Sequence, residues 1–184
     1  MLTLNFSPFP TLTTENLILR QITADDDNEV FIIRSDEGLM KYIDRPPAKS
    51  KAEAVEFIGN ITTYIKNNES ILWAISYKND PKLIGTICFW NIKKEDFRAE
   101  IGFILLPEYH GKGIMDEALR AVIDFGFNTM KLHSIEGNVN PENKASIKLM
   151  ERNNFVREAY FKDHYFYEGK FLDTAIYSLL SPVV

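Results

Sequence analysis

Cysteine and histidine are scarce in this chain of 184 residues, which has one cysteine and three histidines. A single cysteine excludes an intramolecular disulfide. His110, His133 and His164 lie far apart, without the spacing that metal ligands share, so we expect no metal. Cys88 lies in the apolar run LIGTICFW, which favours a small buried thiol over a reactive one.

The chain also lacks long apolar runs and an excess of positive charge. No stretch approaches the roughly 18 apolar residues that a membrane-spanning helix needs. The start, MLTLNFSPFP, is broken by prolines and has no charged segment of the kind that opens a signal peptide. The formal net charge of -5 argues against nucleic acid, whose binding proteins usually carry a basic stripe. These features predict a cytoplasmic protein that binds neither membrane nor nucleic acid.

Apolar residues are plentiful and regularly spaced. They make up 45% of the chain, enough for one well-packed core, and no repeat or linker divides the sequence, so we expect a single domain over residues 1–184. Alternating and helical periodicities predict strands at 17–22, 70–78, 82–92, 97–106, 134–139, 155–167 and 170–180, and helices at 23–34, 51–66, 114–130 and 141–153. Thr23 and Asp26 have the spacing of a capping box, and Pro141 suits a first helical position. The result is a mixed α/β domain, and its three consecutive strands argue against a fully parallel sheet.

Strand 97–106 places different chemistry on its two faces. Phe97, Ala99, Ile101, Phe103 and Leu105 share one face, which we expect to pack against a core helix. The other face carries Arg98, Glu100, Gly102, Ile104 and Leu106, and the glycine is expected to leave open volume beside the carboxylate of Glu100.

Two glycines, Gly111 and Gly113, lie between this strand and the helix that begins near Ile114. Their missing side chains and the N–H groups of the first helical turn would suit an anion such as a phosphate, although a plain turn explains them equally well. Asp116 stands where a dinucleotide-binding motif needs its third glycine, and the pattern of a P-loop is absent.

The loop and the order of elements resemble the GNAT superfamily of acetyl-CoA-dependent N-acetyltransferases. The stretch YHGKGIMDEAL carries the resemblance, with His110, Gly113 and Met115 at the family's motif positions, the first and last departing from its consensus. TENLILRQITADD, AEIGFILLPEYHGKG and NVNPENKASIKLMERNNF resemble the RimJ/RimL-like branch, whose members acetylate ribosomal-protein N-termini. The resemblance covers nearly the whole chain and implies a mostly antiparallel sheet splayed between its fourth and fifth strands.

The resemblance also implies how acetyl-CoA is held. Backbone amides from Gly111 to Asp116 would contact the pyrophosphate, backbone groups near Ile104 to Leu106 would lie beside the acetyl carbonyl, and Asn143 would contact the cofactor. Lys112 would add charge to a phosphate or remain solvated. The expected cofactor-binding residues are Ile104, Leu105, Leu106, His110, Gly111, Lys112, Gly113, Ile114, Met115, Asp116 and Asn143.

Two residues are the catalytic candidates that the resemblance implies. Acetyl transfer needs a neutral amine, and Glu100 would take its proton directly or through water, whereas a surface ion pair with Arg98 is the alternative. Ser146 would protonate the leaving thiolate, because this chain has no tyrosine further along helix 141–153, although a polar residue in a first turn needs no such role. Glu136 is a secondary carboxylate candidate.

The function expected from the resemblance is direct transfer of acetyl to a primary amine in a ternary complex, with a protein N-terminal amine as the favoured acceptor. A small amine (polyamine, amino acid or aminoglycoside) and a non-catalytic acyl-CoA-binding module stay open as alternatives. We expect the N-terminal helices and the last hairpin, with Tyr160, Tyr165 and Tyr167, to shape the acceptor side. Monomer and homodimer are both open.

Overall fold

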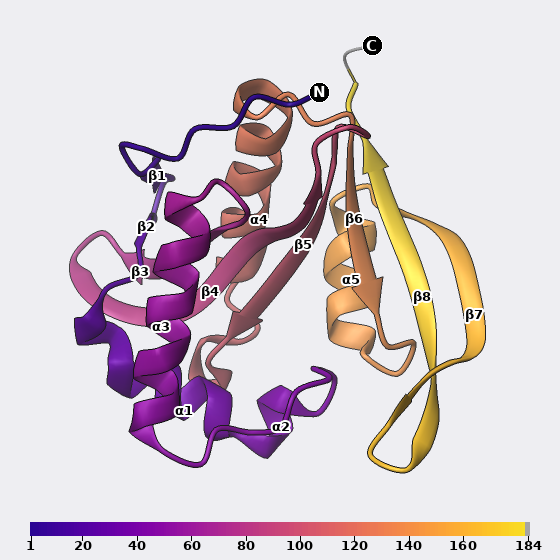
Figure 1. The fold of residues 1–184 in the computed structure, drawn as a ribbon, viewed down its shortest axis with the longest axis horizontal. Coiled ribbons are helices and arrows are strands. Elements are labelled where there is room, and N and C mark those ends of the chain that lie inside the picture. The colour runs from indigo at the N-terminus through magenta and orange to yellow at the C-terminus, as the bar shows by residue number, and fades with distance from the viewer. Residues whose placement is uncertain (183–184) are drawn as a thin grey trace.

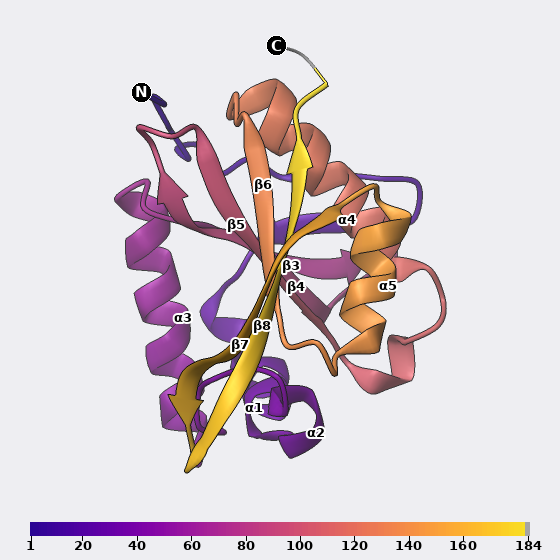
Figure 2. The ribbon, with the colours of Figure 1, turned by 90° about the vertical axis from the view of Figure 1, so that its right-hand side faces the viewer.

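The computed structural model describes residues 1–182 as one eight-stranded sheet with helices on both faces (Figures 1 and 2). The strand order is β1-β2-β3-β4-β5-β6-β8-β7. The strands are β1 (Leu12–Thr13), β2 (Leu17–Gln21), β3 (Ile71–Tyr77), β4 (Asp80–Lys93), β5 (Arg98–Leu105), β6 (Ser134–Val139), β7 (Val156–Tyr167) and β8 (Lys170–Leu180). The α-helices are α1 (Asp27–Ser35), α2 (Glu37–Met40), α3 (Lys51–Lys66), α4 (Ile114–Asp124) and α5 (Lys144–Arg152).

One pairing sets this sheet apart from a regular one. All neighbouring strands are antiparallel except β5 and β6, which run parallel and pair only over Arg98–Glu100 and Ser134–Glu136. Beyond the pair formed by Glu100 and Glu136 the two strands diverge (Figure 1). This confirms the splayed, mostly antiparallel sheet. The fourth and fifth strands of the prediction are β5 and β6, because the short β1 precedes them.

The two faces of the sheet have separate cores. Ala99, Ile101 and Leu105 are buried together with the apolar side of α4, as predicted for that face of β5. Phe97 departs from the prediction: it lies in the turn before β5 with φ of 53°, and its side chain is exposed. Helices α1 and α3 cover the opposite face, where Leu72, Ala74 and Leu83 join their buried side chains.

The helix starts follow local hydrogen bonds. The predicted capping box is present, with Thr23 N–H donating to Asp26 Oδ2 at 2.8 Å, and it caps a 3-10 turn that leads into α1. Helix α5 begins at Lys144 rather than at Pro141, because Asn143 is its N-cap and accepts from Ser146 N–H at 3.1 Å. The predicted helix 114–130 ends as a regular α-helix at Asp124 and continues as a π-helical turn.

No helix within residues 1–182 combines the length and apolar character that a membrane crossing requires.

Gly85 of β4 is expected to tolerate no side chain, because a Cβ there would lie 2.5 Å from the carbonyl oxygen of Ile104. A backbone atom cannot move aside, so Gly85→Ala should lower the free energy of unfolding by about 1–3 kcal/mol. Gly59 is the matched control, since a Cβ there meets nothing within 4 Å in exposed α3, and Gly59→Ala should raise stability by about 0.5–1 kcal/mol. Urea unfolding measures the free energy of unfolding of both variants. Equal changes in the two would contradict the prediction for Gly85.

Candidate active site

The glycine loop is shaped to leave space above the start of α4. Gly111 and Gly113 have φ of 72° and 77°, and Gly113 is the N-cap of the helix. A Cβ built at either glycine meets nothing within 4 Å. The unpaired N–H groups of the first turn of α4 lie next to this open approach, so the loop fits a phosphate group. Lys112 places its Nζ 5.5 Å from the centre of the Tyr109 ring.

Only alternate residues of β5, the strand before the loop, direct their backbone N–H and C=O groups toward the opening between β5 and β6. Leu106 N–H donates to Ile84 O of the neighbouring chain segment at 2.9 Å, so it is not free to bind a ligand. Because backbone groups alternate along a strand, Ile104 also faces β4, while Phe103 and Leu105 face the edge that β6 has left. His110 Nε2 lies 2.7 Å from Leu105 O, which ties the loop to that edge. Of the three predicted residues 104–106, Leu105 therefore has the accessible backbone, and its N–H is the group that remains.

Two carboxylates in the first turn of α4 hold the loop in place, and the sequence analysis assigned neither role. Glu117 accepts from Thr14 Oγ1 at 2.5 Å, from Asn16 N–H at 2.8 Å and from Asn16 Nδ2 at 3.1 Å. Asp116 accepts from Asn153 Nδ2 at 2.8 Å and pairs with Arg120 at 2.9 Å. Glu117 thus joins α4 to the β1–β2 turn, and Asp116 joins α4 to the C-terminal end of α5.

Glu100 is a buried carboxylate at the point where β5 and β6 separate. Its side chain is 6% exposed. Burial raises its pKa and the nearby Glu136 adds to this, whereas hydrogen bonds from Asn91 and Asn138 and the charge of Lys93 act in the opposite direction. Asn91 Nδ2 lies 3.5 Å from Glu100 Oε2. Such a group meets the two demands on a general base, protection from water and a pKa closer to neutrality.

The surroundings of Glu100 correct two expectations. Arg98 does not pair with Glu100: its Nη1 lies 3.1 Å from Glu136 Oε1, and its Nε donates to Ser134 Oγ at 2.9 Å. Gly102 leaves no open volume either, because a Cβ there would lie 3.1 Å from Cys88 Sγ. The absence of a side chain at Gly102 instead makes room for Cys88 of the neighbouring strand β4.

Asn91 and Asn138, which the sequence analysis missed, approach Glu100 from the two neighbouring strands. Asn91 has φ of 47° and lies at an irregularity in β4 between Trp90 and Lys93, where the register with β5 shifts. Asparagine is one of the few residues that adopt this backbone conformation readily. Asn138 lies two residues after Glu136, on the same face of β6. The alternation of side chains along β6 could have placed Asn138 on the same face as Glu136. Nothing in the sequence marked the irregularity in β4 that places Asn91 near Glu100.

Across the splay, α5 packs directly on β6. A Cβ at Gly137 would lie 2.5 Å from Met150 Sδ, so the helix lies close to the strand. The carboxamide oxygen of Asn143 caps the helix, which leaves its NH₂ group for a ligand. Ser146 is partly buried in the first turn. Asn154, which follows the helix, has φ of 66°, a left-handed conformation that asparagine tolerates at helix ends.

The remaining candidates show no geometry that would give them a catalytic or metal-binding role. Burial raises the pKa of Cys88 to about 12, in keeping with a structural thiol. Within residues 1–182 no group of three or more histidine, cysteine, aspartate or glutamate side chains could hold a metal. The three hairpin tyrosines form no single cluster: Tyr160 donates to Asp173 on β8, while burial and Asp44, which follows α2, raise the pKa of Tyr165.

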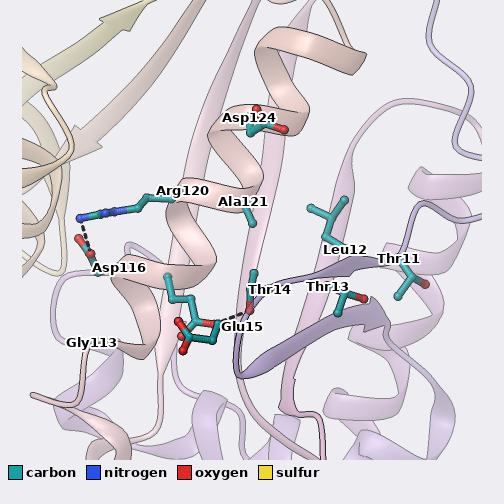
Figure 3. Close-up of a pocket in the computed structure, with 11 residues that line it drawn as sticks. Thr11, Leu12, Thr13, Thr14, Glu15, Gly113, Asp116, Arg120, Ala121 and Asp124 are labelled. Carbon is teal, nitrogen blue, oxygen red and sulfur yellow. Dashed lines mark hydrogen bonds and ion pairs between the residues drawn. The ribbon is translucent and has the colours of Figure 1, made fainter.

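A surface groove of about 630 Å³ lies between α4 and residues 11–15 (Figure 3). Asp116 and Arg120 pair on its α4 side, and Gly113 reaches it from the loop (Figure 3). Residues of β5, β6 and α5 do not line it. The groove therefore adjoins the glycine loop but is separate from the carboxylate at the splay.

Comparison with known proteins supports this geometry. Residues 16–156 match the family model described as the acetyltransferase (GNAT) domain. The chain belongs to this family. It is 31% identical over 95% of its length to the uncharacterized N-acetyltransferase YoaA of Bacillus subtilis, 98% of which is covered. It is 30% identical over 68% of its length to the ribosomal protein uS5-alanine N-acetyltransferase of Escherichia coli, 65% of which is covered.

A solved structure shows the same fold. RimL, a ribosomal L7/L12 α-N-protein acetyltransferase in complex with coenzyme A, superimposes with a TM-score of 0.86 at 19% identity, covering 95% of this chain and all of that one. The protein is an acetyl-CoA-dependent N-acetyltransferase of the GNAT family. Its glycine loop and the open edge of β5 fit the coenzyme.

Glu117→Gln is expected to destabilise the protein, because the charged acceptor of three hydrogen bonds is lost. The loss should be about 1 kcal/mol at neutral pH, since the site is partly solvated. These bonds lower the pKa of Glu117, so its contribution is present above the ordinary pKa and is lost as the pH falls through the lowered value. Unfolding measured at neutral and acidic pH should show the difference shrinking in acid. Exposed Glu15 is the control, and an equal effect of Glu15→Gln would contradict the assignment.

Gly113→Val is expected to weaken acetyl-CoA binding, because the added side chain would fill the open approach to the first turn of α4. Loss of contacts to a charged group should raise Kd about 10- to 100-fold. Gly169→Val is the matched control: that glycine has φ of 80° and equally open surroundings at the β7–β8 turn. Calorimetric titration compares them. Equal acetyl-CoA affinity in the two variants would show that the glycine loop does not bind the coenzyme.

Proposed function

We propose that the protein acetylates the α-amine of a peptide or protein N-terminus, by direct transfer from acetyl-CoA in a ternary complex. The observation that carries the proposal is Glu100, buried at the splay with a raised pKa and held by Asn91 and Asn138. The relationship to a ribosomal-protein-alanine N-acetyltransferase supports this type of acceptor. We place the reaction in the cytoplasm, where such N-termini are made, and in a single domain of residues 1–184.

Each residue has one task in this scheme. Glu100 takes a proton from the acceptor's ammonium group, which makes the amine nucleophilic. The N–H of Leu105, on the open edge of β5, donates to the acetyl carbonyl as negative charge develops there. Ser146 gives a proton to the departing thiolate. Asn143 and the amides from Gly111 to Asp116 hold the coenzyme.

Arg98 keeps the two neighbouring carboxylates distinct. Its ion pair with Glu136 compensates the charge of that residue. Because a second uncompensated carboxylate would disfavour the ionised form of Glu100 further, this pairing limits the rise of its pKa. The arrangement favours Glu100 over Glu136 as the base.

Glu100→Gln is expected to lower kcat by about 10²- to 10⁴-fold, the usual contribution of a general base. The affinity for acetyl-CoA should be nearly unchanged. Thiol release with peptides of free and blocked N-terminus measures the activity, and calorimetry the binding. Glu136→Gln is the matched control and should lose less. A larger loss in Glu136→Gln would reverse the two assignments.

The pH dependence tests the same residue independently. A base must be ionised to accept a proton, so the rate should rise with pH through the raised pKa of Glu100, above the range of an ordinary glutamate. Asn138→Ala removes a donor to the ionised form and should shift this rise to higher pH. Profiles of kcat that superimpose would show that Glu100 does not set the acidic limb.

A further inference from the structure

An exposed tryptophan lies beside the buried carboxylate of Glu100. Trp90 of β4 pairs directly with Glu100 of β5, and its side chain is 42% exposed, whereas the preceding residue, Phe89, is fully buried. Residues directly opposite each other in an antiparallel pair project from the same face, with Cβ atoms about 4.5–5.5 Å apart. The indole of Trp90 therefore borders the carboxylate that acts as the base in the proposed function.

A glycine lets the indole lie close to β5. Gly102 is two residues beyond Glu100 on the same face of the strand, and a Cβ built there would lie 3.7 Å from Trp90 Nε1 and 3.8 Å from its Cδ1. Because Gly102 has no side chain, the pyrrole edge of the indole can lie over the strand. The ring is thus placed next to Glu100 by the backbone of β5, and much of it stays accessible.

The irregularity in β4 brings Trp90 and Asn91 to the same carboxylate. In a regular strand two consecutive residues point to opposite faces. Here Asn91 has φ of 47°, and the register with β5 shifts between Trp90 and Lys93. Asn91 Nδ2 lies 3.5 Å from Glu100 Oε2, so it approaches the carboxylate that Trp90 borders. A hydrogen-bond donor and an apolar ring therefore adjoin Glu100 from one strand.

The two sides of Glu100 differ in chemistry. On the β6 side its neighbour in the sheet is Glu136, which pairs with Arg98 at 3.1 Å, and beyond this point the strands diverge into the opening that the proposed function assigns to the coenzyme. On the β4 side its neighbour is Trp90. An amine that is held at Glu100 and attacks a thioester in the opening directs its carbon substituents away from the coenzyme, and Trp90 lies on that side.

We propose that Trp90 is an acceptor-binding residue that selects amines with an apolar group on the carbon next to the reacting nitrogen. The proposal rests on the proposed function and narrows its substrate class to peptides whose first residue has an aliphatic or aromatic side chain. Contact between such a side chain and the indole removes two apolar surfaces from water. A strongly polar first side chain would instead lose hydration against the ring.

The first test compares acceptors that differ in polarity but little in size. The probes are the tripeptide amides Leu-Ala-Ala and Asn-Ala-Ala, each assayed for thiol release with acetyl-CoA. Contact with the indole should make kcat/KM about 10- to 100-fold higher for the leucine peptide than for the asparagine peptide. A ratio near one, or a preference for the asparagine peptide, would overturn the proposal.

Variants of Trp90 test whether the indole causes this preference. Trp90→Ala should lower kcat/KM for the leucine peptide about 10- to 100-fold and bring the ratio near one, with the Kd for acetyl-CoA unchanged. Trp90→Phe keeps an aromatic ring and should retain most of the preference. Phe171→Ala is the matched control, because this exposed ring of β8 shares a face with Ala175 and Tyr177, which are buried in the core under α4. An equal loss in Phe171→Ala, or an unchanged ratio in Trp90→Ala, would refute the role of Trp90.

Fluorescence separates this inference from the proposed function, because the two tryptophans of the chain differ in environment. Trp73 is buried and donates to Pro10 O at 2.8 Å, whereas Trp90 is exposed. The N-acetylated leucine and asparagine peptides are titrated into the protein with coenzyme A present. The leucine product should shift the emission to shorter wavelength and protect it from quenching by acrylamide, and Trp90→Phe should show neither change. Equal responses to the two products would refute the role of Trp90 alone, whereas absence of thiol release on every peptide would refute the proposed function.

Discussion

The separation of β5 from β6 is the constraint on which the rest of the structure depends. Only three residues of each strand pair before they diverge, so one edge of β5 keeps backbone groups that no strand satisfies. Unpaired strand edges normally invite further pairing, and here the opening is held by contacts on either side. The core under α4 fixes β5, Met150 against Gly137 fixes α5 on β6, and the bond from Asn153 to Asp116 joins the two helices. These contacts hold β5 and β6 apart beyond their short pairing.

The splay also explains why a carboxylate can be buried at this point. Glu100 and Glu136 are the last pair before the strands part, so the two like charges lie on adjacent strands at the edge of the opening. The protein resolves their repulsion unequally. Arg98 neutralises Glu136, whereas Glu100 receives only neutral amide donors from Asn91 and Asn138. The two carboxylates therefore differ in their partners, a cation for Glu136 and neutral amides for Glu100, and burial raises the pKa of Glu100.

Most of the fold could be predicted from the sequence because its long elements have clear periodicities. Strands β3, β4 and β5 and helices α3 and α4 follow apolar patterns that tertiary contacts reinforce. The errors occur where an element is too short to show a period or where tertiary contacts determine its bounds. β1 has two residues and α2 four, too few to show a period. Pro141 favoured an early start of α5, but the carboxamide of Asn143 caps the helix, which begins three residues after Pro141, at Lys144.

The residues of the candidate site also fall into those with a local signal in the sequence and those whose contacts depend on the tertiary structure. Gly111, Gly113 and Glu100 carry local signals, namely glycine spacing and strand alternation. The contacts of Glu117 with residues about 100 positions away, and the partner of Arg98, depend on which strands become neighbours. Alternation alone allowed Arg98 to pair with Glu100, and only the register of β6 assigns it to Glu136. The sequence likewise did not determine which of residues 104–106 direct their backbone groups toward β4. The hydrogen bond from Leu106 N–H to Ile84 O determines it.

Cys88 bears on the choice between direct transfer and a covalent acetyl-enzyme. It is the chain's one nucleophilic thiol and lies across the sheet from Gly102, beside the carboxylate of Glu100. Burial raises its pKa to about 12, and the negative charge of Glu100 acts in the same direction. With such a pKa roughly one thiol in 10⁵ is ionised at neutral pH, and the thiolate is the reactive form. The environment that makes Glu100 a better base makes Cys88 a poorer nucleophile, which supports the proposed direct attack by the amine.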